Sequence, residues 1–365
     1  MVLRFPAEVL RQRLQRFQEE LKAKEIDATM IRTLSSFAYL AGVKWLRPSL
    51  LIPAEGEPVV FVAKGEEDGF REASWIGNVV TFSEGGDLMA KVSGAIRKAG
   101  YKVVGLEYGV ERDAYILFYE MFKRLNPGVK VVDVGPILAE MRSIKDQYEL
   151  EAVRKAGKIA SKAVEAALES VRVGASETEI AAEAYAELLR MGSEKPVVYV
   201  NAGPQPRVHA EPFRDAKVEE GTFVNVTIGA DYDWYYANIS RSVFIGQPGE
   251  KARRAIKCID EAYEYAMSET RGGVKFMDVI RGLDEIYARY GFLDERVVGY
   301  AHGVGLQVEE YPITTIVPKH RFARVQPGMA LAMIHSPLML KGLGQVKLED
   351  TFIVGSDGRL EKVTG

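Results

Sequence analysis

The sequence predicts two domains, an α/β domain followed by an α+β domain. The chain has 365 residues, which is long for one compact domain. Up to about residue 135, helical and strand patterns alternate, as in small α/β domains. Long helical patterns and then strands follow, which indicates an antiparallel sheet flanked by helices. We place the two domains at residues 1–137 and 138–365.

The first domain contains one amphipathic helix and several short strands near its start. The helical pattern is LRQRLQRFQEELKAKEI, at residues 10–26. Strand patterns are ATMIRT, LLIPAEGEPVVFVA with a turn at AEGEP, KVVGLEYG and VKVVDV. No glycine-rich phosphate loop occurs among them.

The second domain opens with long helices. The stretch MRSIKDQYELEAVRKAGKIASKAVEAALESV marks the change of pattern. Ser176 and Glu179 form a capping box that predicts the start of the next helix. A helix pair is expected at residues 252–270 and 276–290.

Composition excludes several classes of function. Hydrophobic residues make up 47% and charged residues 27%, and the net charge of −3 provides no basic surface for nucleic acid or anionic lipid. Cys258 is the single cysteine, so no disulfide forms within the chain and a reducing cytosol is expected. No apolar run reaches the length of a membrane span, so a cytoplasmic protein is expected, with no membrane partner. Only five asparagines occur among many charged residues, which hints at a thermophilic source.

The stretch GTFVNVTIGADYDWYYANISRSVFIG predicts a β-hairpin with a polar face. A four-residue turn at residues 231–234 would pair Thr227 with Asn238, their Cβ atoms roughly 5 Å apart. Two carboxylates at such a pair could share a metal ion, whereas threonine and asparagine offer only weak neutral oxygens. Asp231 and Asp233 are expected to be solvated turn residues.

A second informative stretch is YAHGVGLQVEEYP. His302 lies beside Gly303 and Gly305. Glycine at these positions indicates a backbone that approaches another group too closely for a Cβ atom. The imidazole of His302 is therefore expected at a crowded site.

The order of motifs resembles the pita-bread metallopeptidases, the family of prolidase (Xaa-Pro dipeptidase), aminopeptidase P, methionine aminopeptidase and creatinase. The resemblance covers nearly the whole chain, through RSIKDQYELEAVRKA, the hairpin, AHGVGLQVEEYP, MALAMIHSPLM and QVKLEDTFIV. It implies a pita-bread second domain, preceded by the α/β domain that prolidases, aminopeptidase P and creatinase carry.

The resemblance also implies a metal site. In active members two divalent ions are held by an aspartate on each hairpin strand, the histidine of HGVG and two later glutamates. Those five positions fall on Thr227, Asn238, His302, His335 and Glu349. Only His302 and Glu349 keep the family's residue, although the spacing from 227 to 238 is the family's own.

Charge argues against two ions here. The family site sets four carboxylates against two divalent ions, whereas this chain supplies one, Glu349, so a second cation would be uncompensated. His302, His335 and Glu349 remain a suitable set for a single ion such as zinc, manganese, cobalt or iron. The competing interpretations are that His335 is an ordinary strand residue, that HGVG is only a tight connection, and that Glu349 pairs with Lys347. The sequence thus predicts at most one divalent ion, or none.

Two further residues bear on substrate. His209 falls where the family has a substrate-side histidine, with an exposed loop histidine as the alternative interpretation. Glu309 replaces a second family histidine that handles transition-state charge, and an acid there favours a cationic group instead. Creatinase, a metal-free member, uses a histidine and glutamates on a guanidinium substrate.

Three functions are compatible with these residues. The first is a Xaa-Pro dipeptidase-like hydrolase of C–N bonds in small peptide-like substrates, with one metal ion or none. The second is a metal-independent, creatinase-like hydrolase with His209 as acid and base. The third is a non-catalytic binding protein. The resemblance further implies a homodimer.

Overall fold

The structure is a computed structural model that describes residues 4–109, 111, 115–334 and 336–365. The chain divides into two compact units, Met1–Arg142 and Ser143–Gly365. No helix within the described residues is both long and apolar enough to cross a bilayer.

The N-terminal unit alternates helices and strands, as the sequence predicts. Its elements are α1 (Ala7–Ala23), β1 (Ala28–Ile31), α2 (Leu34–Ala41), β2 (Leu50–Pro53), β3 (Val59–Ala63), α3 (Glu67–Ala73), β4 (Val79–Phe82), α4 (Gly85–Ala99), β5 (Val103–Leu106), α5 (Tyr115–Leu125), β6 (Lys130–Asp133) and α6 (Gly135–Ser143).

A single mixed sheet organises this unit. Its strand order is β4-β3-β2-β1-β5-β6, and β2 is antiparallel to both of its neighbours while the other neighbouring pairs are parallel. Apolar side chains of α4 and α5 pack on the sheet, with Val92, Ile96 and Phe122 fully buried beside Met30 and Val104. The predicted α/β domain is confirmed.

The C-terminal unit contains longer helices and three antiparallel sheets. Its elements are α7 (Gln147–Glu169), α8 (Glu177–Arg190), β7 (Val197–Asn201), β8 (Phe223–Tyr232), β9 (Tyr235–Phe244), α9 (Glu250–Glu269), α10 (Phe276–Tyr290), β10 (Ala301–Gly303), β11 (Glu310–Ile313), η1 (Pro318–Phe322), β12 (Ala330–Met333), β13 (Leu338–Leu340), β14 (Gly344–Val346), β15 (Asp350–Val354) and β16 (Leu360–Lys362).

Helix starts in this unit follow local sequence signals. Ser176 caps α8, and its hydroxyl accepts from Glu179 N while the Glu179 side chain accepts from Ser176 N, so the predicted capping box is confirmed. Asp146 and Glu149 form the same arrangement at the start of α7. The predicted helix pair is present as α9 and α10.

Two separate apolar cores leave a polar layer between their sheets. Helices α7 and α8 cover one face of the sheet β7-β8-β9, where Val224, Val226 and Ile228 of β8 are buried. Helices α9 and α10 pack with the sheet β11-β10-β12-β15-β16 in a second core that includes Leu331 and Phe352. The opposite face of the β8–β9 hairpin is therefore turned toward the second sheet.

Candidate functional site

The β8–β9 hairpin presents the polar face that the sequence predicts, in a different register. Thr227 pairs with Ser240, and Asn238 pairs with Gly229, so the expected pairing of 227 with 238 is wrong. The hairpin closes through two residues, Asp233 and Trp234, both with positive φ (48° and 73°), rather than through four. Because the pairing differs by two residues, each side chain keeps its predicted face.

Asp231 is not a solvated turn residue, which corrects a second expectation. It is the next-to-last residue of β8 and is 0% exposed. Its Oδ1 accepts from the Ser193 hydroxyl at 2.6 Å and from the backbone N–H groups of Glu194 (3.1 Å) and Lys195 (2.8 Å). A carboxylate with these donors anchors the α8–β7 connection to the hairpin.

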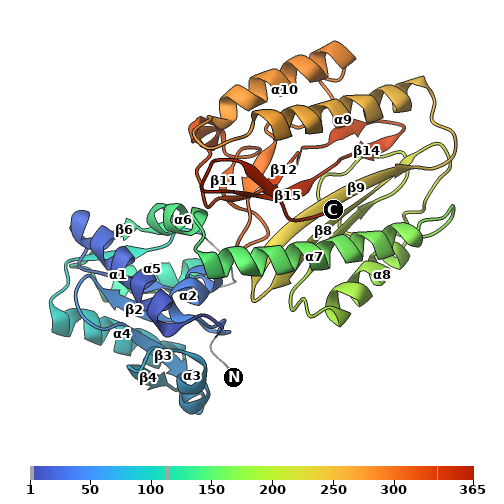
Figure 1. Cartoon of the computed structure of the whole chain (residues 1–365). Helices are drawn as coiled ribbons and strands as arrows, with labels where there is room; N and C mark the ends of the chain where they lie inside the picture. Colours follow the sequence, from blue (N-terminus) through green and yellow to red (C-terminus); the bar gives the residue numbers. More distant parts are fainter. Residues whose placement is uncertain (1–3, 110, 112–114, 335) are drawn as a thin grey trace. The chain divides into compact units, whose positions relative to one another are not determined.

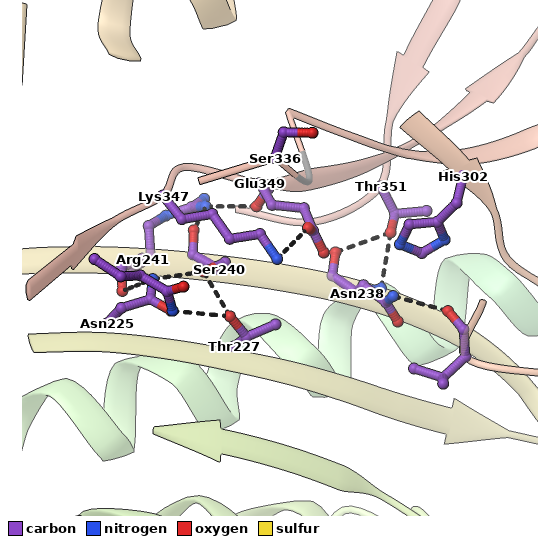
Figure 2. Close-up of polar contacts among 12 residues, drawn as sticks. Asn225, Thr227, Asn238, Ser240, Arg241, His302, Ser336, Lys347, Glu349 and Thr351 are labelled. Carbon is purple, nitrogen blue, oxygen red and sulfur yellow. Dashed lines mark hydrogen bonds and ion pairs between the residues drawn. The ribbon is translucent and has the colours of Figure 1, made fainter. Parts of the chain in front are cut away.

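Neutral side chains fill the polar face around Asn225 (Figure 2). Asn225 Nδ2 donates to the hydroxyls of Ser240 (2.8 Å) and Ser242 (3.0 Å). Its Oδ1 accepts from Gln345 Nε2 at 2.6 Å and from the Thr227 hydroxyl at 3.2 Å. Thr227 and Ser240 also share a hydroxyl–hydroxyl bond of 2.8 Å. The network satisfies its own donors and acceptors within the protein.

Asn238 lies further along β9 on the same face. Its Nδ2 donates to Val308 O at 2.9 Å, and its backbone N–H and C=O both bond to the Thr351 hydroxyl at 2.8 Å. Its Oδ1 is buried and accepts no hydrogen bond from any described residue. Asn238 thus links the hairpin to β15 and contributes only a neutral oxygen.

Lys347 and Glu349 form a buried ion pair facing these neutral groups (Figure 2). The Lys347 Nζ lies 2.7 Å from Glu349 Oε2, and the two side chains are 3% and 0% exposed. Glu349 exchanges two backbone bonds with Ser240 (3.0 and 3.1 Å), and the Ser242 hydroxyl bonds the Lys347 backbone, which fixes both residues against β9. The expected alternative, that Glu349 pairs with Lys347, is confirmed.

His302 lies on β10 and is 0% exposed. Its Nδ1 lies 2.9 Å from Gly303 O. The glycines of HGVG are explained by close internal contacts: a Cβ on Gly303 would lie 2.4 Å from Tyr311 O, and one on Gly305 would lie 2.1 Å from Glu310 Oε1. The predicted crowding is therefore real, and the crowding groups belong to the chain itself.

His209 lies in the loop between β7 and β8, and it remains accessible to solvent. Its ring centroid is 5.4 Å from that of Tyr199. Packing around the ring lowers the pKa of His209, the Lys347 ammonium lowers it further, and the carboxylates of Glu309 and Glu349 oppose both effects. The imidazole is therefore neutral at pH 7 and lies within the electrostatic reach of the ion pair.

The remaining predicted ligand, His335, lies outside the described residues, so the trio of His302, His335 and Glu349 stays a prediction. Among the residues that the structure describes, no group of three or more His, Cys, Asp or Glu side chains is arranged to hold a metal ion.

Both parts of the chain match known protein families. Residues 13–144 match the creatinase/prolidase N-terminal domain, and residues 151–356 match metallopeptidase family M24. This chain belongs to family M24. The pita-bread architecture and the creatinase-type N-terminal domain are those that its sequence predicts.

Relatives in the family are Xaa-Pro dipeptidases. The chain is 25% identical to the Xaa-Pro dipeptidase of Pyrococcus furiosus over 351 residues, covering 96% of this chain and 97% of the relative. It is similar to the crystal structure of prolidase from Pyrococcus horikoshii OT3, with a TM-score of 0.86, 26% identity and coverage of 97% and 98%. The fold of a Xaa-Pro dipeptidase from Bacillus anthracis is also similar, with a TM-score of 0.85 at 21% identity and 97% coverage of both chains.

Two features of the site were not anticipated from the sequence. Gln345, on β14, completes the network around Asn225. Nothing in the sequence indicates this contact. Glu177 orders the loop that carries His209, although in the sequence it reads as an ordinary acidic residue in the first helical turn.

Proposed function

We propose that this chain is a hydrolase that cleaves a C–N bond in small peptide-like substrates without a two-metal centre. The observation that carries the proposal is the buried ion pair between Lys347 and Glu349. Glu349 is the single carboxylate among the five positions that the family uses for its ions, and Lys347 neutralises it. Before any ion binds, the pair sums to zero, −1 plus +1, against the +4 of two divalent ions.

The neutral side chains at the other positions do not fit two ions either. The Thr227 hydroxyl is engaged by Ser240 and Asn225, and the Asn238 amide nitrogen by Val308 O. A divalent ion bound to Glu349 would lie near the Lys347 ammonium. At roughly 4 Å and an effective dielectric constant of about 20, their repulsion is on the order of 8 kcal/mol. No carboxylate at the hairpin positions offsets this repulsion.

His209 supplies the acid–base chemistry in this proposal. A neutral imidazole can take a proton from an attacking water and return it to the departing nitrogen as the C–N bond breaks. Glu309 and Glu349 then stabilise the imidazolium that forms between these two steps. Glu309 also disfavours a free substrate carboxylate by charge repulsion, so a neutral or cationic ligand is preferred.

The second candidate is a non-catalytic protein that binds such ligands in the same fold. The observation in its favour is the network around Asn225, in which uncharged groups satisfy one another and need no ion to hold the hairpin face together. This candidate and the hydrolase share a fold and differ in turnover.

One set of assays separates these functions. The chelator-treated protein is incubated with Xaa-Pro dipeptides, their C-terminal amides and guanidinium compounds, and turnover and binding are both measured. Turnover in chelator that His209→Ala abolishes and His320→Ala retains supports the metal-independent hydrolase. Turnover that returns only with two bound ions contradicts it. Binding with no turnover favours the non-catalytic protein.

A further inference from the structure

The segment from Ala202 to Phe213, which we call the His209 loop, connects β7 to the chain that leads into β8. The loop folds back on the end of β7: Val200 N donates to Ala210 O at 3.0 Å, and Asn201 Nδ2 donates to Gln205 O at 3.0 Å. Within it, His209 has a φ of 47°, in the left-handed region that a non-glycine residue adopts only when its surroundings impose it.

A single buried carboxylate binds both ends of the His209 loop. Glu177, the first residue of α8, is 0% exposed. Its Oε1 accepts from Ala202 N at 2.7 Å, where the loop begins, and its Oε2 accepts from Phe213 N at 2.9 Å, where the loop ends. Hydrogen bonds from backbone N–H groups to a charged acceptor are stronger than neutral ones.

Arg207 attaches the middle of the loop to the same carboxylate. Its Nη2 donates to Glu177 Oε1, and its backbone N donates to Asn201 Oδ1 at 3.3 Å. Its guanidinium carbon lies 4.4 Å from the ring centroid of Phe213. Glu177 is thus held by three donors from the start, middle and end of one loop, and its charge is balanced by Arg207.

We propose that Glu177 is a positioning residue that fixes the His209 loop and thereby the place of the His209 imidazole against the Tyr199 ring. Glu177 is the first residue of α8, so the helix holds its carboxylate in a fixed place for the loop to bind. The helix N-terminus also favours the negative charge of Glu177. The role of the imidazole in turnover rests on the proposed function, whereas its positioning by Glu177 can be tested without any substrate.

The test is Glu177→Gln, which keeps the size of the side chain and replaces one acceptor oxygen by an NH2 group. The new NH2 group cannot accept from the backbone N–H that it faces, so one loop hydrogen bond is lost. The charge-assisted bond from Arg207 is lost as well. We expect the His209 loop to open, so that hydrogen exchange of its backbone amides speeds up at least tenfold. We also expect the His209 C2-proton titration followed by NMR to move upward, toward the ordinary value for histidine. The charged and titratable groups that influence this titration are Lys347, Glu309, Glu349 and His302.

Glu179→Gln is the matched control. It removes a carboxylate from the same first turn of α8 and weakens the capping bond from Ser176 N, and Glu179 contacts Ser176 and Arg172 rather than the loop. We expect this variant to leave the His209 titration and the exchange of the loop amides unchanged. Arg207→Gln, which alters a side chain that is 28% exposed, is expected to give an intermediate shift in a folded protein.

A merely structural role would give a different result. If Glu177→Gln lowers the free energy of unfolding while the His209 titration and loop exchange stay at their native values, the proposal is overturned. If Glu177→Gln does not fold, an unchanged titration in Arg207→Gln overturns it equally. Because neither readout involves turnover, failure of the hydrolase proposal would leave this test intact.

Discussion

The Lys347–Glu349 pair makes a direct prediction for stability. Lys347→Met removes the ammonium that lies 2.7 Å from a fully buried carboxylate. Loss of one partner of a buried pair leaves the other charge poorly compensated, at a cost of about 3–5 kcal/mol. We expect the free energy of unfolding, measured with urea, to fall by that amount.

Two further variants identify the cause of this loss. Lys347→Met combined with Glu349→Gln removes both charges and should recover most of the stability. Lys362→Met is the control, because Lys362 pairs with Asp350 while 40% exposed, and Asp350 keeps Arg241 at 2.9 Å. If Lys347→Met lowered the free energy of unfolding by less than about 1 kcal/mol, Lys347 would not be needed to compensate the charge of Glu349.

The charges around His209 predict opposite shifts in two variants. The pKa of His209 lies below its ordinary value of 6.5 because groups packed around the ring partly remove it from water and because of the Lys347 charge, while Glu309 raises it. Lys347→Met should therefore raise the pKa, and Glu309→Gln should lower it further. NMR titration of the imidazole measures both. Shifts of the same sign in the two variants would show that His209 does not face these groups.

The sequence reveals the residues of the site better than their pairing. Thr227 and Asn238 could be assigned to the hairpin from the sequence, because the motifs around them are intact. The burial of Asp231 was not, since its donors come from Ser193 and the following backbone, nearly forty residues earlier. Acidic residues near a turn are usually solvated, and here the tertiary contacts override that tendency.

At the scale of elements, the hairpin shows why register is difficult to predict. A two-residue turn of type I′ needs positive φ at both residues and is typically signalled by Asn-Gly or Asp-Gly. Here the residues are Asp233 and Trp234. Trp234 is held in this conformation by its surroundings, because the residue is 6% exposed and its indole donates to Glu194 Oε2 at 3.1 Å. The alternation of side chains nevertheless predicted the polar face of the hairpin.

Asp231 joins the hairpin to the connection between α8 and β7. Asp231→Ala removes three hydrogen bonds to Oδ1, two of them from the backbone that joins α8 to β7. Because the buried Ser193 hydroxyl and two backbone N–H groups would lose their charged acceptor, we expect the free energy of unfolding to fall by about 2 kcal/mol. Asp215→Ala, at a side chain that is 86% exposed, is the control and should change stability little. Equal effects of the two substitutions would contradict the anchoring role.

At the scale of the whole molecule, the fold was predictable because its signals are local and numerous. Strand and helix patterns alternate in the first unit. In the second unit a capping box marks the start of α8, and the family motifs follow one another in order. The charge balance of the site depends on residues brought together from β8, β9 and the segment before β15. Their types can be read in the sequence, while the 2.7 Å contact of Lys347 with Glu349 cannot.

Because the chain carries a creatinase-type N-terminal domain, we predict a homodimer, as the family resemblance implies. Light scattering at micromolar concentration should give a mass of about 81 kDa, which is twice the 40.5 kDa of one chain. A mass of one chain at that concentration would contradict this expectation.

The central claim is that the site has lost its two-metal centre, and the metal content of the native protein tests it most directly. The protein is incubated with zinc, manganese, cobalt or ferrous iron, separated from free ions and measured by elemental analysis. Thr227→Asp, Asn238→Asp and His335→Glu combined, which returns the ligand set to four carboxylates, is the positive control and should bind more metal. We predict at most one ion per native chain; two tightly held ions per native chain would contradict the account.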